Sequence, residues 1–283
     1  MRPLLYLAFV CTTLFAGDPV YELARARFNR TEYEASLRLL LPEPEKNAAT
    51  LALIGQNYFM MGDATQATDF FQKAVALEPA NSVYYHWLGR AYGRRAETGS
   101  MFTAMGNASK ARQNFEKAIQ LDSHNSEAVN DLFEFYVEAP SFLGGGLDKA
   151  QRLADLIAAH DAAEGHYAQA RIDEKRKEYH GAENHLRRAM ELAPRQVGRV
   201  IDLAKFLAKH GSFEESEKTF QAAEKIAPGA PKLMFARAST YIEAKRNIET
   251  AKNLLHKYLR AQLTPDDPPR SEARKLLEQV SGG

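Results

Sequence analysis

The sequence has 283 residues, of which 45% are hydrophobic and 26% are charged, and this composition predicts a packed chain rather than a disordered one. Its 37 basic and 36 acidic residues leave a formal net charge of +1, which argues against a nucleic acid or an anionic membrane surface attracted by net charge. Local charged patches remain compatible with this balance. Long alternation of Val, Ile and Thr is missing, so we expect no sheet.

The first 17 residues form a separate segment. Arg2 precedes a short apolar run, residues 4–15, which ends at small residues. This arrangement resembles a secretory signal peptide, and the run is too short to span a bilayer. We expect residues 1–17 to be removed on export, which leaves a periplasmic or secreted protein with no stable membrane anchor. A buried or frayed first helix is the alternative. Cys11 is the only cysteine, so the mature chain would have no thiol chemistry.

The clearest local pattern lies in residues 48–81. It predicts a helix, a tight turn at Gly62, a second helix, and a stop at Pro79. Gly62 allows the positive φ that ends many helices, and proline cannot continue a helix interior. Gly55 is small enough for a neighbouring helix to come close, and Phe71 fills the space beside that contact.

The spacing of these residues resembles one tetratricopeptide repeat (TPR), a helix hairpin of about 34 residues. Because one hairpin cannot bury its apolar face, it needs neighbours stacked against it. The resemblance to the TPR family covers roughly residues 18–280, and about a dozen residues around the glycine turn at 139–148 also resemble exported bacterial TPR proteins. It implies an all-α fold, a right-handed superhelical solenoid of hairpins with a C-terminal capping helix. The predicted hairpins are 18–47, 48–81, 82–125, 126–162, 163–196, 197–230 and 231–265, and the capping helix and tail are 266–283.

Two of the predicted hairpins are longer than the repeat. Residues 97–108 form either an extended helix pair or a loop with apolar contacts. Residues 139–148 contain three successive glycines, but no Gly-Lys-Ser/Thr follows and no strand precedes them, so they do not indicate a phosphate-binding loop. Insertions of this kind usually project from one face of the array.

The resemblance also implies a concave groove lined mainly by the first helix of each hairpin. Residues off the packing stripe at helical spacing should face that groove, as for His86, Arg90 and Arg94, which are spaced four residues apart. The pattern predicts a mostly basic wall with an apolar patch at one end, suited to a peptide with acidic residues and an apolar anchor. The predicted partner-binding residues are Phe59, Met60, His86, Arg90, Arg94, Tyr167, Arg171, Lys205 and Lys209.

A simpler interpretation of the same residues stays open. Arg90 and Arg171 can pair with Glu134 between neighbouring helices and leave a solvated surface, with each pair worth about 0–1 kcal/mol. The aromatic cluster at residues 84–87 can likewise be a ligand box, or it can pack against the preceding hairpin.

No motif in the sequence supplies a nucleophile, a metal site or a cofactor site. The patterns His-Glu-x-x-His and Gly-x-Ser-x-Gly are missing, and the single cysteine cannot form a paired-cysteine site. We therefore expect no enzymatic activity, no catalytic residues, no metal and no cofactor. The main hypothesis is a non-enzymatic scaffold or adaptor in the cell envelope, whose groove holds a partner protein or peptide and no nucleic acid. The alternative is an accessory subunit of an envelope solute or lipid transport system.

Overall fold

The computed structural model describes residues 18–281, and every regular element in this range is a helix. The predicted signal peptide lies outside the described residues. In chain order the helices are α1 (Pro19–Asn29), α2 (Tyr33–Leu40), α3 (Ala48–Met60), α4 (Ala64–Leu77), α5 (Ser82–Thr98), α6 (Met101–Leu121), α7 (Ser126–Glu138), the 3-10 helix η1 (Ser141–Leu143), α8 (Leu147–His160), α9 (Ala162–Lys175), α10 (Tyr179–Leu192), α11 (Val197–Lys209), α12 (Phe213–Ile226), α13 (Pro231–Glu243), α14 (Ile248–Arg260) and α15 (Arg270–Ser281).

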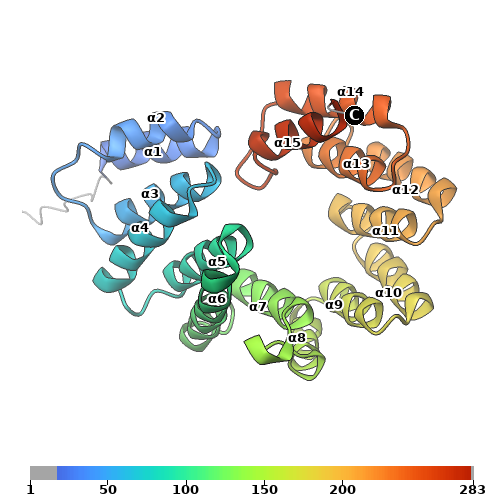
Figure 1. The fold of residues 1–283 in the computed structure, drawn as a ribbon, viewed down its shortest axis with the longest axis horizontal. Coiled ribbons are helices and arrows are strands. Elements are labelled where there is room, and N and C mark those ends of the chain that lie inside the picture. Colours follow the sequence, from blue (N-terminus) through green and yellow to red (C-terminus); the bar gives the residue numbers. More distant parts are fainter. Residues whose placement is uncertain (1–17, 282–283) are drawn as a thin grey trace, which may run out of the picture.

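Consecutive helices pair into hairpins, from α1 with α2 to α13 with α14, and α15 covers the last pair. Figure 1 shows the hairpins arranged around a ring, with α5, α7, α9, α11 and α13 on its inner side and α6, α8, α10, α12 and α14 outside them. The predicted fold class, an all-α right-handed solenoid of helix hairpins with a capping helix, is confirmed.

Glycines on inner helices allow two hairpins to close tightly. A Cβ on Gly55 in α3 would lie 2.8 Å from the ring of Phe71 in α4. A Cβ on Gly89 in α5 would lie 2.6 Å from the ring of Phe115 in α6. Both rings are buried, so they have little room to move. The predicted role of Gly55 and Phe71 in close helix contact is confirmed.

Five hairpin turns share one backbone conformation. The second residue after the first helix takes a positive φ of 58° at Thr31, 88° at Gly62, 67° at Lys177, 89° at Gly211 and 52° at Lys245. In each turn, the next N–H donates to the carbonyl five residues before it, at 2.8–3.0 Å. This is the Schellman closure of a helix end, and it satisfies carbonyls that the helix leaves unpaired. The positive φ expected at Gly62 is confirmed.

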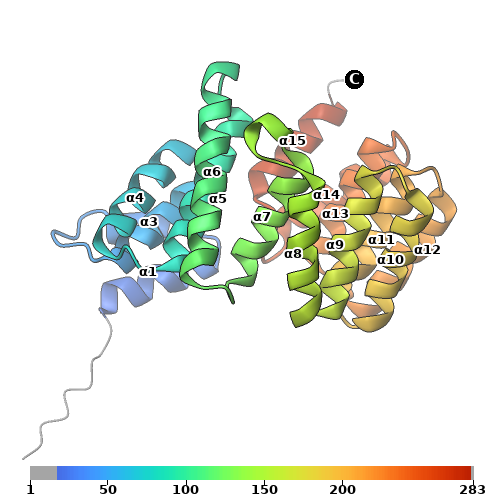
Figure 2. The same cartoon turned by 90° about the horizontal axis from the view of Figure 1, so that it is seen from below.

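The two long hairpins differ in form. Residues 97–108 extend a helix pair, since α5 has 17 residues and α6 has 21. Figure 2 shows this hairpin projecting beyond its neighbours. Residues 139–148 instead hold the short helix η1, followed by Gly144 and Gly146 with φ of 93° and 146°.

The two ends of the array contact each other through side chains, although they are 239 residues apart in sequence. Arg270 donates from Nη1 to Thr31 Oγ1 at 2.9 Å, and Arg94 Nη2 lies 3.5 Å from Glu272 Oε1. Burial at this seam raises the pKa of Tyr33 to about 12, although the Arg270 charge opposes the shift. The first hairpin and the capping helix therefore close the solenoid into a ring (Figure 1).

The close contact at Gly89 predicts opposite effects for two alanine substitutions in α5. Gly89→Ala places a methyl group against Phe115 and Ala111, and such overpacking costs about 1–3 kcal/mol, more than the gain of up to about 1 kcal/mol in helix propensity. The added methyl group of Gly93→Ala meets nothing within 4 Å, so this variant shows only the stabilisation from higher helix propensity. We expect the urea midpoint to fall for the first variant and to rise for the second. Equal midpoints would contradict the packing argument.

The seam predicts a short distance between labels on opposite ends of the chain. Spin labels at Glu34 and Arg274, which line the same pocket at the seam, should give a narrow distance distribution in electron paramagnetic resonance. The double variant Thr31→Val and Glu272→Gln removes the hydroxyl that accepts from Arg270 and the charge that attracts Arg94 of α5, while keeping the side-chain shapes. It should broaden the distribution and move it to longer distances.

The control for the seam is a matched pair of substitutions away from it, Thr65→Val in α4 and Glu249→Gln in α14. Both positions are exposed, so these changes should leave the distribution unaltered. A narrow distribution that survives the seam variant would show that packing alone closes the ring.

Candidate partner-binding surface

Seven of the predicted residues keep exposed surface in the structure, and two do not. Met60 and His86 are only 7% and 1% exposed, so the expectation that these two face the groove is wrong. The others are partly or fully exposed, and they are Phe59, Arg90, Arg94, Tyr167, Arg171, Lys205 and Lys209.

Met60 and His86 are buried because each inner helix packs on several sides. Met60 belongs to the buried cluster of the first hairpins, with Phe28 and Leu37. His86 points toward the next hairpin, where its Nε2 lies 2.8 Å from Asp131 Oδ2. These positions hold the array together and leave only a narrow stripe of each inner helix for a partner.

Aromatic rings and arginines meet at the α3–α5 part of the surface. The rings of Phe59 and Trp87 are 5.5 Å apart, edge to face. The Arg90 guanidinium lies over both, 4.4 Å from the Trp87 centroid and 5.0 Å from that of Phe59. Trp87 also stacks on Phe71 of the preceding hairpin at 5.8 Å, which confirms the packing interpretation of the aromatic cluster.

Phe59, Trp87 and Arg90 form an aromatic–arginine cluster, of which Phe59 and Arg90 border an open pocket of about 490 Å³. The opposite wall of the pocket includes Phe135 and Leu143. Apolar, cationic and carboxylate groups, the last from Glu97, Asp131, Glu134 and Glu138, therefore face a common hollow in which large side chains of a partner can be held.

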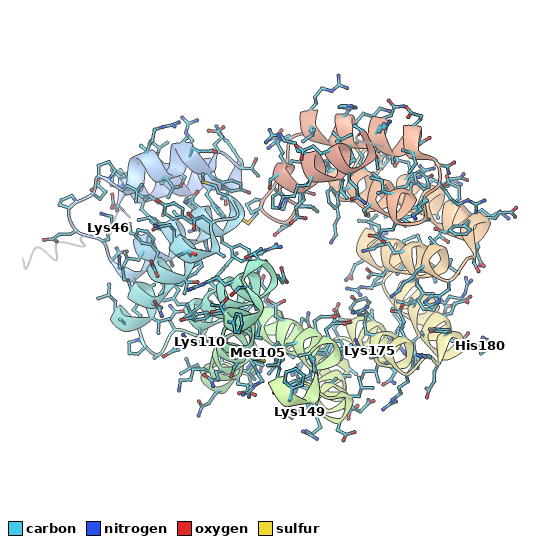
Figure 3. The ribbon with its side chains drawn as sticks, viewed as in Figure 1. Lys46, Met105, Lys110, Lys149, Lys175 and His180 are labelled. Atoms are coloured by element: carbon cyan, nitrogen blue, oxygen red, sulfur yellow. The ribbon has the colours of Figure 1, made fainter. Side chains whose placement is uncertain are left out.

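An ion-pair network occupies the middle of the surface. Arg171 on α9 lies 2.9 Å from Glu134 and 3.0 Å from Glu138 on α7. Lys175, at the end of α9 (Figure 3), is 2.8 Å from Glu138. The hydrogen bond from Lys175 is the largest cause that lowers the pKa of Glu138. The pairing of Arg171 with Glu134 expected from sequence is confirmed.

The network continues to the next inner helix. Glu174 lies 2.8 Å from Lys209 and 3.1 Å from His210 at the end of α11. Burial acts to raise the pKa of Glu174, but its hydrogen bonds with these two residues outweigh burial and lower the pKa. Neighbouring inner helices are thus connected across the concave face by alternating charges.

A second hollow lies between α7, α9 and α11. Arg199 lies 2.7 Å from Glu164, and its guanidinium covers the ring of Tyr167 at 4.5 Å. Burial raises the pKa of Tyr167, Glu164 and Asp202. This part of the wall therefore holds partly desolvated carboxyl groups beside the half-buried guanidinium of Arg199.

The concave wall is of mixed charge and not mostly basic. Arg90 is 3.8 Å from Asp131, and Arg199 is paired with Glu164. Lys205 is exposed, and within the described part of the chain no salt bridge joins it to a carboxylate. Sequence reasoning missed Arg199 and Glu164, which lie near the starts of their helices. Opposite charges at equivalent places in neighbouring first helices are the signal that could have found them.

Metal-binding clusters and membrane-spanning helices are the two remaining features to consider. Among residues 18–281, no cluster of three or more His, Cys, Asp or Glu side chains is arranged to hold a metal ion. Nor does any helix in the part that the structure describes have the length and apolarity to cross a membrane.

Comparison with known proteins identifies one repeat directly. A family model described as tetratricopeptide repeat matches residues 48–81. A search of curated proteins finds no match to this sequence.

Solved structures share the fold at low sequence identity. A tetratricopeptide repeat protein from Parabacteroides merdae is 14% identical, with a TM-score of 0.58 over 93% of this chain and 97% of that one. A thermophilic TPR protein from Thermus thermophilus is 19% identical, with a TM-score of 0.54 over 66% of this chain and 97% of that one. A chain of the Cut9–Hcn1 hetero-tetramer of the APC/C is 17% identical, with a TM-score of 0.51 over 94% of this chain and 49% of that one.

The matched repeat contains the Gly55–Phe71 contact and the Gly62 turn, and the same hairpin architecture extends along the described residues. Residues 48–81 therefore match the tetratricopeptide repeat family, and the described chain as a whole shares the fold of TPR proteins.

Proposed function

We propose that this protein is a non-enzymatic scaffold whose concave surface holds an extended segment of a partner protein. The observation that carries the proposal is the aromatic–arginine cluster at the edge of an open pocket on that surface. Aromatic residues and arginine dominate the binding energy of protein interfaces, because they combine large apolar area with polar contacts. Repeat arrays use their concave surfaces for such binding.

The closed ring supports an extended segment rather than a folded domain as the bound element. The first hairpin and the capping helix meet through Arg270 and Thr31, so the inner helices surround the bound segment on most sides. A single stretch of chain can follow such a surface from one hairpin to the next.

The charge network supports selection among partners. On the free surface, Arg171 pairs with Glu134 and Glu138. A bound segment that breaks these ion pairs must offer its own charged groups to the same three side chains. Buried or half-buried charges left without a partner are costly, and this cost penalises segments with the wrong charge pattern. The bound segment would therefore present both signs of charge to the middle of the surface and an apolar anchor to the Phe59 end.

We place this activity in the cell envelope, after removal of residues 1–17. The basis is the sequence of that segment, an apolar run preceded by Arg2. Holding a partner by shape and charge needs no turnover, which is consistent with a scaffold or adaptor acting on other exported proteins.

The proposal predicts that a photoreactive amino acid crosslinks the partner from the inner surface only. The amino acid p-benzoylphenylalanine, placed at Phe59, should yield defined adducts in an envelope fraction of the native cell. The same amino acid at Leu192, which is exposed on the outer helix α10, should not yield them. Mass spectrometry of the adducts identifies the partner and the segment that is bound.

A matched pair of arginine variants then tests the cluster. Arg90→Ala should weaken binding of the identified segment by at least about tenfold, as for an interface hot spot. Arg188→Ala, an exposed arginine paired with Glu191 on outer helix α10, should leave the affinity unchanged. Equal affinity for both variants, or identical adducts from the two labelled positions, would refute the proposed surface. Absence of any protein adduct from Phe59 would favour the transport-accessory alternative.

A further inference from the structure

The tip of the α5–α6 hairpin carries exposed apolar side chains with no covering in the structure. Phe102 is 93% exposed and Met105 is 51% exposed, three residues further along α6. Residues at this spacing share one face of a helix. Figure 2 shows the tip projecting beyond the adjacent hairpins, so these side chains lie at the far end of a protrusion.

A second exposed aromatic residue lies on the same side of the molecule. Phe142, in η1, is 75% exposed, and η1 contacts α6. A Cβ on Gly144, just after η1, would lie 2.8 Å from the Arg112 side chain of α6. Figure 2 shows η1 beside the α5–α6 hairpin and set back from its tip. The two insertions therefore lie on the same side of the molecule, and each carries an exposed aromatic residue.

Basic side chains outnumber acidic ones around the tip. Lys110 and Arg112 are the charged residues of 98–115. Arg112 pairs with Glu116 at 2.7 Å, and Glu97, just before this range, pairs with Arg94 at 3.2 Å. Arg95 and Lys110 both lie over the ring of Tyr92, at 5.8 and 5.2 Å. Figure 3 shows Met105 and Lys110 in the same sector of the ring.

We propose that the α5–α6 tip is a reversible contact site for an anionic lipid bilayer. Lys110 lies eight residues after Phe102, which is about 12 Å along the helix. Apolar side chains of peripheral proteins enter the headgroup and acyl boundary by about 5–10 Å. With Phe102 inserted to that depth, Lys110 and Arg95 lie at the level of the lipid phosphates.

A bilayer fits this surface better than a protein partner does. The apolar groups sit on a convex, projecting end, and their long cationic neighbours can extend toward phosphates while their stems stay apolar. The near-neutral net charge of the chain gives no general attraction, so the contact depends on the tip alone. The inference does not rest on the proposed scaffold function, because the tip lies outside the concave surface.

The test is a flotation assay with phosphatidylcholine vesicles that contain or lack phosphatidylglycerol. The protein used starts at Asp18 and so keeps all the helices that the structure describes. We expect binding to the anionic vesicles and much weaker binding to the neutral ones. The double variant Phe102→Ser and Met105→Ser should lower the partition coefficient by at least about tenfold. Lys110→Gln and Arg95→Gln should each lower it by about fivefold.

The control variant is Leu77→Ser, which changes a residue that is 57% exposed at the end of α4. It should bind anionic vesicles as the parent does. All these positions are on the surface, and an unchanged melting temperature verifies that each variant is folded. Failure of the parent to bind anionic vesicles, or an equal loss with Leu77→Ser, would overturn the proposal. If the tip variants instead abolish self-association of a chain that binds no vesicles, the tip is a protein contact and the proposal is wrong.

Discussion

The structure depends on close contacts between the two helices of a hairpin, clearest where a glycine on inner helix α3 or α5 meets a large ring on the helix outside it. Gly55 against Phe71 and Gly89 against Phe115 bring the two helices of a hairpin together until no methyl group would fit between them. Such a hairpin still has an apolar face to bury, and the next hairpin covers it. A single cluster of buried side chains accordingly runs from Leu51 in α3 to Ile172 in α9.

This packing determines where a partner can bind. An inner helix gives most of its surface to its own hairpin and to both neighbours, so only a narrow stripe faces the centre of the ring. The stripe of α5 carries Arg90, whereas His86, one turn earlier, is committed to the contact with Asp131 on α7. Because the backbone beneath is held rigidly, charged side chains on adjacent stripes reach one another, as Arg171 and Glu134 do.

Much of the fold could be predicted because each hairpin repeats a local rule. Gly62 and Pro79 mark the ends of helices by backbone chemistry alone. The resemblance to the TPR family then predicted that successive hairpins stack into a solenoid. Turns at Thr31, Lys177 and Lys245 were harder to predict, since their positive φ comes from the Schellman closure and not from glycine.

The candidate surface was only partly predictable. Helical spacing puts His86 and Arg90 on one face. It cannot say which of the two is buried against a neighbouring helix and which is exposed to solvent. The pairing of Arg90 with Asp131 becomes visible only when neighbouring helices are placed side by side. Contact between Arg270 and Thr31 depends on the small rotation of each hairpin summed over the whole array, which no local pattern contains.

We propose that the inner helices surround a segment of a partner protein. The most direct measurement is hydrogen–deuterium exchange of the chain alone and bound to the partner recovered by crosslinking from Phe59. The account predicts slower exchange in α5, α7, α9 and α11, with little change in the outer helices α6, α10 and α12. Protection confined to the outer helices, with the inner ones unchanged, would contradict it.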